Sequence, residues 1–306
     1  MDDRLLVLNR DDDCASGVDP ETGETVRTVA TEFDPITVET SPDGAKSYVT
    51  CAQGSALNVI DNETFTVTGR ITHDLFDHPS GLAVRTCANE LWLVSRNNSR
   101  VFVFDIETDE LLDVIPTHQS LSNTLSLNAK ESTAYVTNSN GNTLTVLDCE
   151  ERRIAVDVPV GNGPEGVATN PETNNVYVTI QQESRLTVHD PNRYETLYET
   201  ELGSSPIGIE FSPDASIALV PNRMSNDVSV IETRFHRSEE GRPWEVERVP
   251  VGIAPGEVVF DTAGSTAYVS NNKTNDVSVI DIESREEVDR IDVRTHPNGI
   301  TYLSRD

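Results

Sequence analysis

The chain repeats itself along almost its whole length, and this repetition constrains its fold more than any other feature. The stretch AYVTNSNGNTLTVLD at 134–148 returns as AYVSNNKTNDVSVID at 267–281, and weaker copies align on an anchor residue, usually proline, which opens a short apolar run. The anchors are Pro35, Pro79, Ser122, Pro164, Pro206, Pro255 and Pro297. Their spacings are 44, 43, 42, 42, 49 and 42 residues, and extra residues in RFHRSEEGRPW at 234–244 explain the 49. A period near 42 predicts an array of similar structural units.

Each unit has the pattern of four short strands. Residues 164–203 contain the runs GVAT, VYVTI, RLTVHD and ETLYETEL, separated by turns rich in Asn, Pro, Glu and Ser. Short alternating runs between such turns predict an antiparallel meander, and the sequence shows no substantial helix. Four strands in 40 to 45 residues are typical of a β-propeller blade.

The two ends of the chain complement each other. After Pro297 only one strand, GITYL, remains, whereas RLLVLN, CASGVD and ETVRTVAT at the start match the second, third and fourth strands of a unit. We therefore expect an all-β, seven-bladed propeller in a single domain, 1–306, closed by pairing of the C-terminal strand with the N-terminal three. The expected blades are 35–78, 79–121, 122–163, 164–205, 206–254, 255–296, and 297–306 joined to 1–34.

Recurrent tetrapeptides give a family resemblance. YVTN at 135–138, YVSN at 268–271 and YVT at 48–50 and 177–179 resemble the YVTN family of β-propeller repeat proteins, as do PDG at 42–44 and VSVID at 277–281. The resemblance implies a seven-bladed propeller of a kind common in surface-layer or exported proteins. It does not define an activity, because propellers have unrelated functions.

The charge of the chain excludes some partners. Acidic residues outnumber basic ones 52 to 23, for a net charge of −29. Nucleic-acid binding needs a basic surface, so we expect none, and we expect no membrane insertion because no run of 18 apolar residues occurs. No signal peptide is visible, which predicts a cytoplasmic protein, or an exported one if a leader has been removed. The four cysteines lack CxxC spacing and are expected to be free thiols, with a Cys14–Cys51 disulfide as the alternative.

The repeat predicts which side chains meet. Strand direction alternates, so the loops before the first strand and after the second lie on one face of the disc, which we call the top. If the first strand lines the central channel, as the resemblance implies, residues beside each anchor ring the channel mouth. Gly81, Gly166, Gly208 and Gly299 next to the anchors suit close backbone packing there.

Unusual residues cluster at this mouth. His78, His296, Asp34 and Glu165 flank anchors and are candidate acid–base groups, and His78, His296 and Asp34 are also candidate ligands of a divalent metal. Blades 7, 1 and 2 are neighbours, so their histidines, carboxylate and arginines fall in one sector. The candidate ligand-binding residues are Arg10, Arg96, Arg223, Asn138, Asn298, Glu257 and His118. The alternative interpretation is that these polar residues are solvated and have no role.

Three functions remain open. The first is a monomeric binding propeller whose top face captures a small molecule or a protein, and the second is a hydrolase or lyase at the channel mouth, with lactonases and virginiamycin B lyases as analogues of fold. The third is a structural component of a cell envelope. No Walker loop, dinucleotide-binding glycine motif, G-x-S-x-G or HExxH occurs, so nucleotide-dependent and metalloprotease chemistry is disfavoured.

Overall fold

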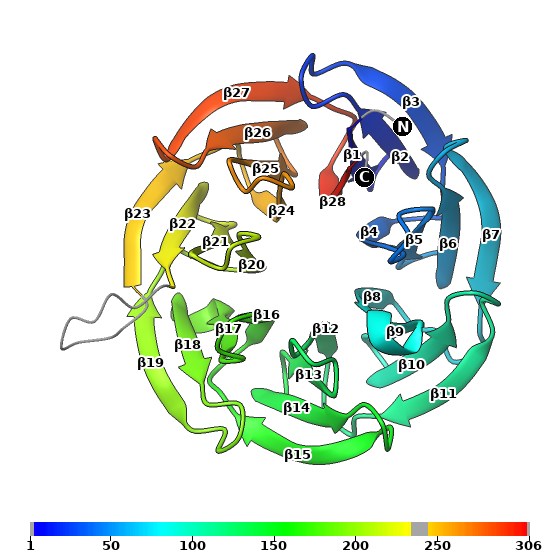
Figure 1. Cartoon of the computed structure of the whole chain (residues 1–306), viewed down its shortest axis with the longest axis vertical. Coiled ribbons are helices and arrows are strands. Elements are labelled where there is room, and N and C mark those ends of the chain that lie inside the picture. The colour runs from blue at the N-terminus through cyan, green and yellow to red at the C-terminus, as the bar shows by residue number, and fades with distance from the viewer. Residues whose placement is uncertain (1–2, 234–243, 305–306) are drawn as a thin grey trace.

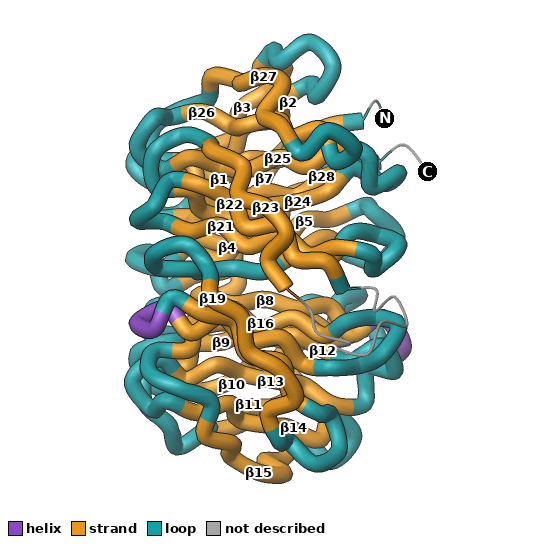
Figure 2. The backbone as a smooth tube through the Cα atoms, turned by 90° about the vertical axis from the view of Figure 1, so that its left-hand side faces the viewer, coloured by secondary structure: helices purple, strands orange, loops and turns teal. Residues whose placement is uncertain are grey.

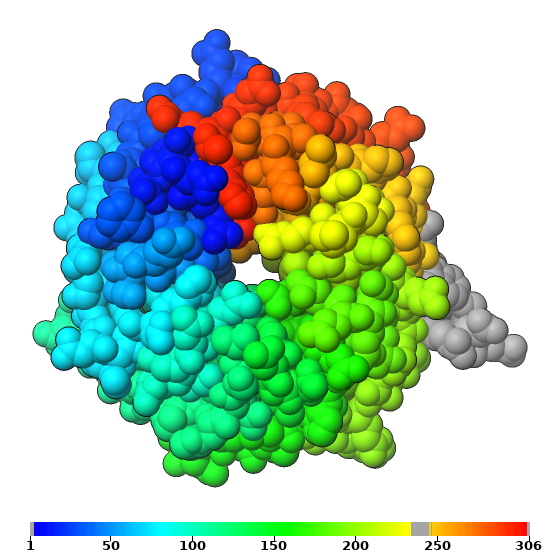
Figure 3. Space-filling model, turned by 180° about the vertical axis from the view of Figure 1, so that it is seen from behind, coloured from blue at the N-terminus to red at the C-terminus, as the bar shows by residue number. Residues whose placement is uncertain are grey.

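Seven four-stranded antiparallel sheets surround a central channel, as expected (Figure 1). The computed structural model describes residues 3–233 and 244–304, so most of the sequence insertion at 234–244 lies outside the described residues. Seen from the side, the molecule is a disc with the strands stacked around it (Figure 2). An opening passes through the middle of the disc (Figure 3).

The first four blades are formed by strands between Pro35 and Glu201. Blade 1 comprises β4 (Pro35–Thr40), β5 (Lys46–Cys51), β6 (Ala56–Asp61) and β7 (Thr66–Thr72). Blade 2 comprises β8 (Pro79–Arg85), β9 (Glu90–Ser95), β10 (Arg100–Asp105) and β11 (Leu111–Pro116), with the 3-10 helix η1 (Thr86–Ala88) between its first two strands. Blade 3 comprises β12 (Ser122–Leu127), β13 (Thr133–Asn138), β14 (Thr143–Asp148) and β15 (Arg153–Pro159). Blade 4 comprises β16 (Pro164–Thr169), β17 (Val176–Ile180), the 3-10 helix η2 (Gln181–Glu183), β18 (Arg185–His189) and β19 (Thr196–Glu201).

The remaining blades include the one that joins the two ends of the chain. Blade 5 comprises β20 (Glu210–Phe211), β21 (Ile217–Asn222), β22 (Asp227–Glu232) and β23 (Trp244–Pro250). Blade 6 comprises β24 (Pro255–Phe260), β25 (Thr266–Asn271), β26 (Asp276–Asp281) and β27 (Glu286–Asp292). Blade 7 comprises β28 (Pro297–Leu303), β1 (Arg4–Asn9), β2 (Cys14–Val18) and β3 (Thr25–Ala30).

The ring closes by the predicted pairing. The last strand, β28, pairs antiparallel with β1, so that Leu303 lies opposite Arg4 and Pro297 lies opposite Asn9. The hydroxyl of Tyr302 also donates to the carboxylate of Asp3 at 2.9 Å. Because one sheet contains both ends of the chain, the seventh blade has four strands like the others and the ring is closed.

The first two residues of the YVTN motif fill opposite blade interfaces. Successive side chains of a strand point to opposite faces, so Tyr and Val cannot pack on the same neighbour. In blade 3, Tyr135 packs against Val178 of blade 4, whereas Val136 packs against Trp92 of blade 2. Tyr135, Val136 and Val178 are all buried. The motif therefore encodes contact with both adjacent blades.

Where the motif carries a hydroxyl residue, in blades 1, 3, 4 and 6, this residue ties its blade to the next. Its side chain donates to the backbone carbonyl of the residue that follows the next blade's anchor, as from Thr137 to Glu165 at 2.8 Å and from Thr179 to Ile207 at 2.8 Å. The equivalent bonds elsewhere run from Thr50 to Ser80 and from Ser270 to Asn298. These hydroxyls are inaccessible to solvent, and their bonds satisfy carbonyls next to the channel.

The asparagine of the motif holds the second strand to the third. Asn138 donates from Nδ2 to the hydroxyls of Thr143 at 3.1 Å and Thr145 at 2.9 Å. The same side-chain bond seven residues along the chain joins Asn9 to Ser16, Asn222 to Ser229 and Asn271 to Ser278. A fully buried carboxamide needs such partners, which gives this position a structural explanation.

Three of the four channel glycines are required by close packing, but the fourth is not. A Cβ added to Gly166 would lie closer than 3.0 Å to the carbonyl oxygen of Ile207 in blade 5, and Gly81 and Gly299 face similar backbone contacts. Gly208 has nothing within 4 Å of the same position. The expectation of crowding is therefore wrong for Gly208, whose added methyl group would project into open space.

This difference gives a matched pair of variants. We expect Gly166→Ala to lower the free energy of unfolding by about 1–3 kcal/mol, because blades 4 and 5 must separate to admit the methyl group. Gly208→Ala should leave stability unchanged or raise it by about 0.4–1 kcal/mol through the unfolded state. Urea unfolding of both variants measures the difference, and equal losses would contradict the packing described here.

Candidate functional site at the channel mouth

The backbone before each anchor has one conformation throughout the ring. All seven residues that precede an anchor have φ between 54° and 67°, in the left-handed region. They are Asp34, His78, Leu121, Gly163, Ser205, Ala254 and His296. Aspartate and histidine are enriched in this region compared with most other residues. The left-handed backbone is therefore one reason why aspartate and histidine occur at Asp34, His78 and His296, in addition to any function.

The same residues fix the position of three arginines along the channel axis. Each of the seven accepts a hydrogen bond at its carbonyl from the backbone N–H of the residue that follows the second strand of its blade, at 2.9–3.1 Å. The donors are Arg10, Ala52, Arg96, Ser139, Gln181, Arg223 and Asn272. This repeated bond places Arg10, Arg96 and Arg223 at one level around the channel, from blades 7, 2 and 5.

A cavity of about 160 Å³ occupies the mouth. Arg10, Arg96, Arg223 and His78 contribute to its wall. So does the residue after every anchor: Ile36, Ser80, Asn123, Glu165, Ile207, Gly256 and Asn298. Of the residues selected from the sequence, seven therefore line one cavity: Arg10, His78, Arg96, Glu165, Arg223, Glu257 and Asn298. Their roles in binding remain predictions.

The three arginines differ in how far their donors are used. Arg10 donates from Nε to Asp34 at 2.6 Å. Arg223 donates from an Nη atom to Asn272 at 2.6 Å, but its buried Nε has no partner among residues 3–233 and 244–304. Arg96 likewise has a buried Nε without a partner in that part of the chain. A buried unpaired donor costs about 1–3 kcal/mol, so two guanidinium groups here retain binding capacity at the expense of stability.

Mutual repulsion marks the mouth as electropositive. Burial, followed by the charge of Arg10, lowers the pKa of Arg223, while Glu165 opposes the shift. Burial and then Arg96 lower the pKa of His78, with smaller contributions from Asp34, which raises it, and Arg10. His78 is therefore neutral at pH 7, where it can accept a proton or a hydrogen bond.

Four of the predicted site residues lie elsewhere. Asp34 is buried against Arg10, and the Nδ1 atom of His296 faces Asp11 at 3.3 Å on the top surface. His118 is exposed on the loop before blade 3, and Asn138 is enclosed within its sheet by the hydrogen bonds given above. None of the four belongs to the wall of the mouth cavity, so we do not carry them into the proposed site.

The predicted metal ligands are not brought together. Within the described ranges, no three His, Cys, Asp or Glu side chains gather closely enough to hold a metal ion. Asp34 instead pairs with Arg10, His296 faces Asp11 and His78 lines the mouth cavity, so we propose no metal. The four cysteines are free, and burial raises the pKa of the Cys51 thiol to about 12, which leaves it protonated and unreactive.

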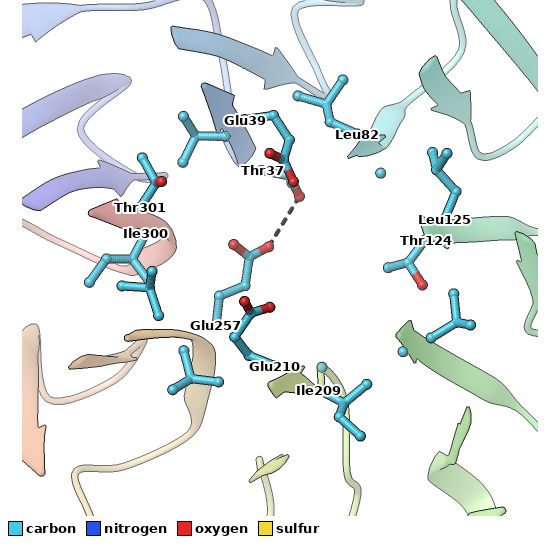
Figure 4. Close-up of a pocket in the computed structure, with 17 residues that line it drawn as sticks. Thr37, Glu39, Leu82, Thr124, Leu125, Ile209, Glu210, Glu257, Ile300 and Thr301 are labelled. Carbon is cyan, nitrogen blue, oxygen red and sulfur yellow. Dashed lines mark hydrogen bonds between the residues drawn. The ribbon is translucent and has the colours of Figure 1, made fainter. Parts of the chain in front are cut away.

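Below the mouth, three carboxylates share a second cavity of about 250 Å³. Glu39, Glu210 and Glu257 come from blades 1, 5 and 6 and point into the channel toward one another (Figure 4). Glu257 accepts a hydrogen bond from Thr37 at 3.1 Å and lines both cavities. The sequence analysis identified Glu257 but missed Glu39 and Glu210. Strand alternation could have revealed them, because both lie four residues after an anchor, on the channel side of the first strand.

These carboxylates titrate far above their usual range. Burial in the channel, then the charges of Glu210 and Glu257, raise the pKa of Glu39 to about 8. Burial raises the pKa of Glu257 to about 7, and burial with repulsion from Glu257 raises that of Glu210 to about 7. The Glu210 side chain is exposed to the channel cavity, but protein surrounds that cavity, so solvent within it would stabilise the charge less well than bulk water does.

The raised pKa of Glu39 makes stability depend on pH. The folded state holds the Glu39 proton up to about pH 8, whereas the unfolded chain releases it near its ordinary value of 4.5, so this carboxyl favours folding less as the pH rises between the two. Glu39→Gln should therefore raise the melting temperature by an amount that grows from about pH 5 to pH 8. Thermal unfolding across that range measures it. Glu63→Gln on an exposed turn is the control, and a pH-independent difference for Glu39→Gln would contradict the assignment.

The geometry defines a seven-bladed β-propeller with a polar cavity at one end of its channel. A family model for YNCE-like β-propellers matches residues 2–306, and the chain belongs to that family. This agrees with the propeller family expected from the YVTN repeats. No curated protein matches the chain, and no helix within the described residues is long and apolar enough to cross a membrane.

Solved structures share the fold at low sequence identity. A protein of unknown function from Desulfotomaculum acetoxidans superposes with a TM-score of 0.84 at 14% identity, over 99% of each chain. Kuenenia stuttgartiensis hydrazine synthase gives 0.81 at 17% identity, over 91% of this chain and 92% of that one. The dihydro-heme d1 dehydrogenase NirN, in complex with DHE, gives 0.70 at 13% identity, over 97% and 74%. At these identities the likeness concerns the fold alone.

Proposed function

We propose that this protein is a binding propeller whose channel mouth takes a small carboxylate-bearing ligand. The observation that carries the proposal is the convergence of Arg10, Arg96 and Arg223 on one cavity of a chain whose net charge is −29. Electrostatic repulsion by the acidic surface disfavours anions elsewhere, so a local cluster of guanidinium groups is a selective exception.

The chemistry of the wall favours a carboxylate over a more highly charged anion. A guanidinium group presents two parallel donors that match two carboxylate oxygens. Arg96 and Arg223 retain unpaired Nε donors, and turning toward the cavity would pair them with a ligand oxygen. Glu165 and Glu257 stand on the same wall and would repel the second charge of a phosphate. Asn123 and Asn298 add amide groups that can orient the ligand.

The arginines can be tested one at a time. Acetate should raise the melting temperature in a saturable way at constant ionic strength, with phosphate less effective. Arg96→Gln and Arg223→Gln should each weaken acetate binding about tenfold to a hundredfold, since a hydrogen bond to a charged group contributes about 1.5–3 kcal/mol. Isothermal calorimetry checks both values.

Arg153→Gln is the matched control. Arg153 is exposed on the outer strand β15, so its loss changes the net charge equally without touching the mouth. Acetate should bind this variant as it binds the wild type. Equal weakening in all three variants, or no acetate binding to the wild type, would refute the proposal.

A hydrolase or lyase is the second candidate, and it depends on His78. This imidazole lines the cavity and is neutral at pH 7, so it can serve as a general base toward a ligand bound by the arginines. A panel of lactones assayed with the wild type and His78→Ala tests this role. Turnover that survives the substitution would exclude His78 as the base.

A further inference from the structure

The channel changes sign along its axis. Arginines from blades 7, 2 and 5 surround the mouth, and glutamates from blades 1, 5 and 6 line the cavity beneath. The two cavities adjoin along the channel, because four residues contribute to both: Thr37, Thr124, Gly208 and Glu257. A molecule that enters from the top therefore meets positive charge first and negative charge second.

Each charged layer is only partly paired within the described residues, and Arg10 is the mouth arginine that has a carboxylate partner, Asp34. Arg96 and Arg223 each keep a buried Nε without a partner. At the other end, Glu257 has one carboxylate oxygen bonded to Thr37, and Glu39 and Glu210 repel it and each other. Like charges held together in a channel destabilise the fold. A single ligand with opposite charges at its two ends would relieve both layers at once.

The repeat sets the separation of the layers. The mouth ring is bonded to the residue before each anchor, which is Ala254 in blade 6, and Glu257 lies three residues further along the chain, within β24. At about 3.3 Å per residue the two levels lie at most about 10 Å apart along the backbone, and a register shift between Pro255 and Val258 shortens this distance. Charges separated by several methylene groups match such a spacing better than the adjacent charges of an α-amino acid do.

We propose that the ligand is a zwitterion with well-separated charges, such as an ω-amino acid or a short peptide. Its carboxylate binds Arg96 and Arg223 at the mouth, and its ammonium group lies beside Glu257 in the channel. This inference rests on the proposed function, because it requires the carboxylate site, and it adds the second charge and the length of the ligand.

A homologous series of small molecules tests the inference. Glycine, β-alanine, 4-aminobutyrate and 6-aminohexanoate are each compared by calorimetry with the unsubstituted carboxylate and the amine of the same length. Glycine should bind no better than acetate. We expect 4-aminobutyrate to bind at least about tenfold more tightly than butyrate, and 6-aminohexanoate at least about tenfold more tightly than hexanoate. The reason is that the ammonium group gains a charge-assisted hydrogen bond. The amines alone should bind more weakly than the amino acids.

The pH adds an independent signature. Glu257 ionises near pH 7, with Glu39 and Glu210 beside it and Arg10, Arg96, Arg223, His78 and Glu165 above. As these channel carboxyls lose protons from about pH 6 to pH 8, butyrate should bind more weakly and 4-aminobutyrate relatively more tightly. His78 stays neutral above its lowered pKa and does not oppose this trend.

Variants separate this inference from the proposed function. Glu257→Gln should abolish the advantage of 4-aminobutyrate over butyrate while both still bind, and Glu63→Gln should retain it. If carboxylates bind but the amino group confers no advantage, or if the advantage survives Glu257→Gln, the zwitterion inference is overturned and the carboxylate site stands. If no carboxylate binds, the proposed function fails as well. If amines bind as tightly as amino acids, the inference also fails.

Discussion

The arrangement depends on one repeated interaction, the hydrogen bond from a second-strand hydroxyl to the first strand of the next blade. Thr137 and Thr179 show it most clearly, each bonding a carbonyl next to an anchor. The bond fixes the position of one inner strand relative to the next along the channel axis. The pairing of β1 with β28 joins the last blade to the first and closes the ring. Within the described residues the bond occurs at four of the seven blade junctions, and all seven blades share the backbone bond from the residue after the second strand to the residue before the anchor. Together these bonds bring residues more than 200 positions apart in the chain to the same level of the channel.

Within each blade, the residues that stabilise the fold and the candidate functional residue occupy different positions of the repeat. Tyr, Val, Thr and Asn of the motif are buried and engaged in packing or hydrogen bonding, as Tyr135, Val136, Thr137 and Asn138 illustrate. The next residue contributes its backbone N–H to the fold in every blade, whereas its side chain differs from blade to blade. This position holds arginine in three blades and small or neutral residues in the other four, which concentrates positive charge at one end of the channel, at the expense of stability where a guanidinium donor stays unpaired.

The fold could be predicted from the sequence because periodicity reports the pairing of strands directly. The same reasoning placed Arg10, Arg96 and Arg223 at the mouth, since every blade presents that position alike. It could not separate Asn138 from them, because only the structure shows its carboxamide bonded to Thr143 and Thr145. Nor could it anticipate the contact of His296 with Asp11 or the pairing of Asp34 with Arg10, which accompany the absence of both residues from the cavity wall. Side-chain direction and local ion pairs depend on contacts that a repeat alignment does not record.

The central claim is that the channel mouth is an anion site within an acidic protein, and anomalous diffraction from crystals soaked in bromide tests it most directly. Bromide requires no assumption about the natural ligand, and its position can be located without ambiguity. The account predicts a bromide peak between the guanidinium groups of Arg96 and Arg223 that acetate displaces. Bromide bound only on the outer surface, with none at the mouth, would contradict it.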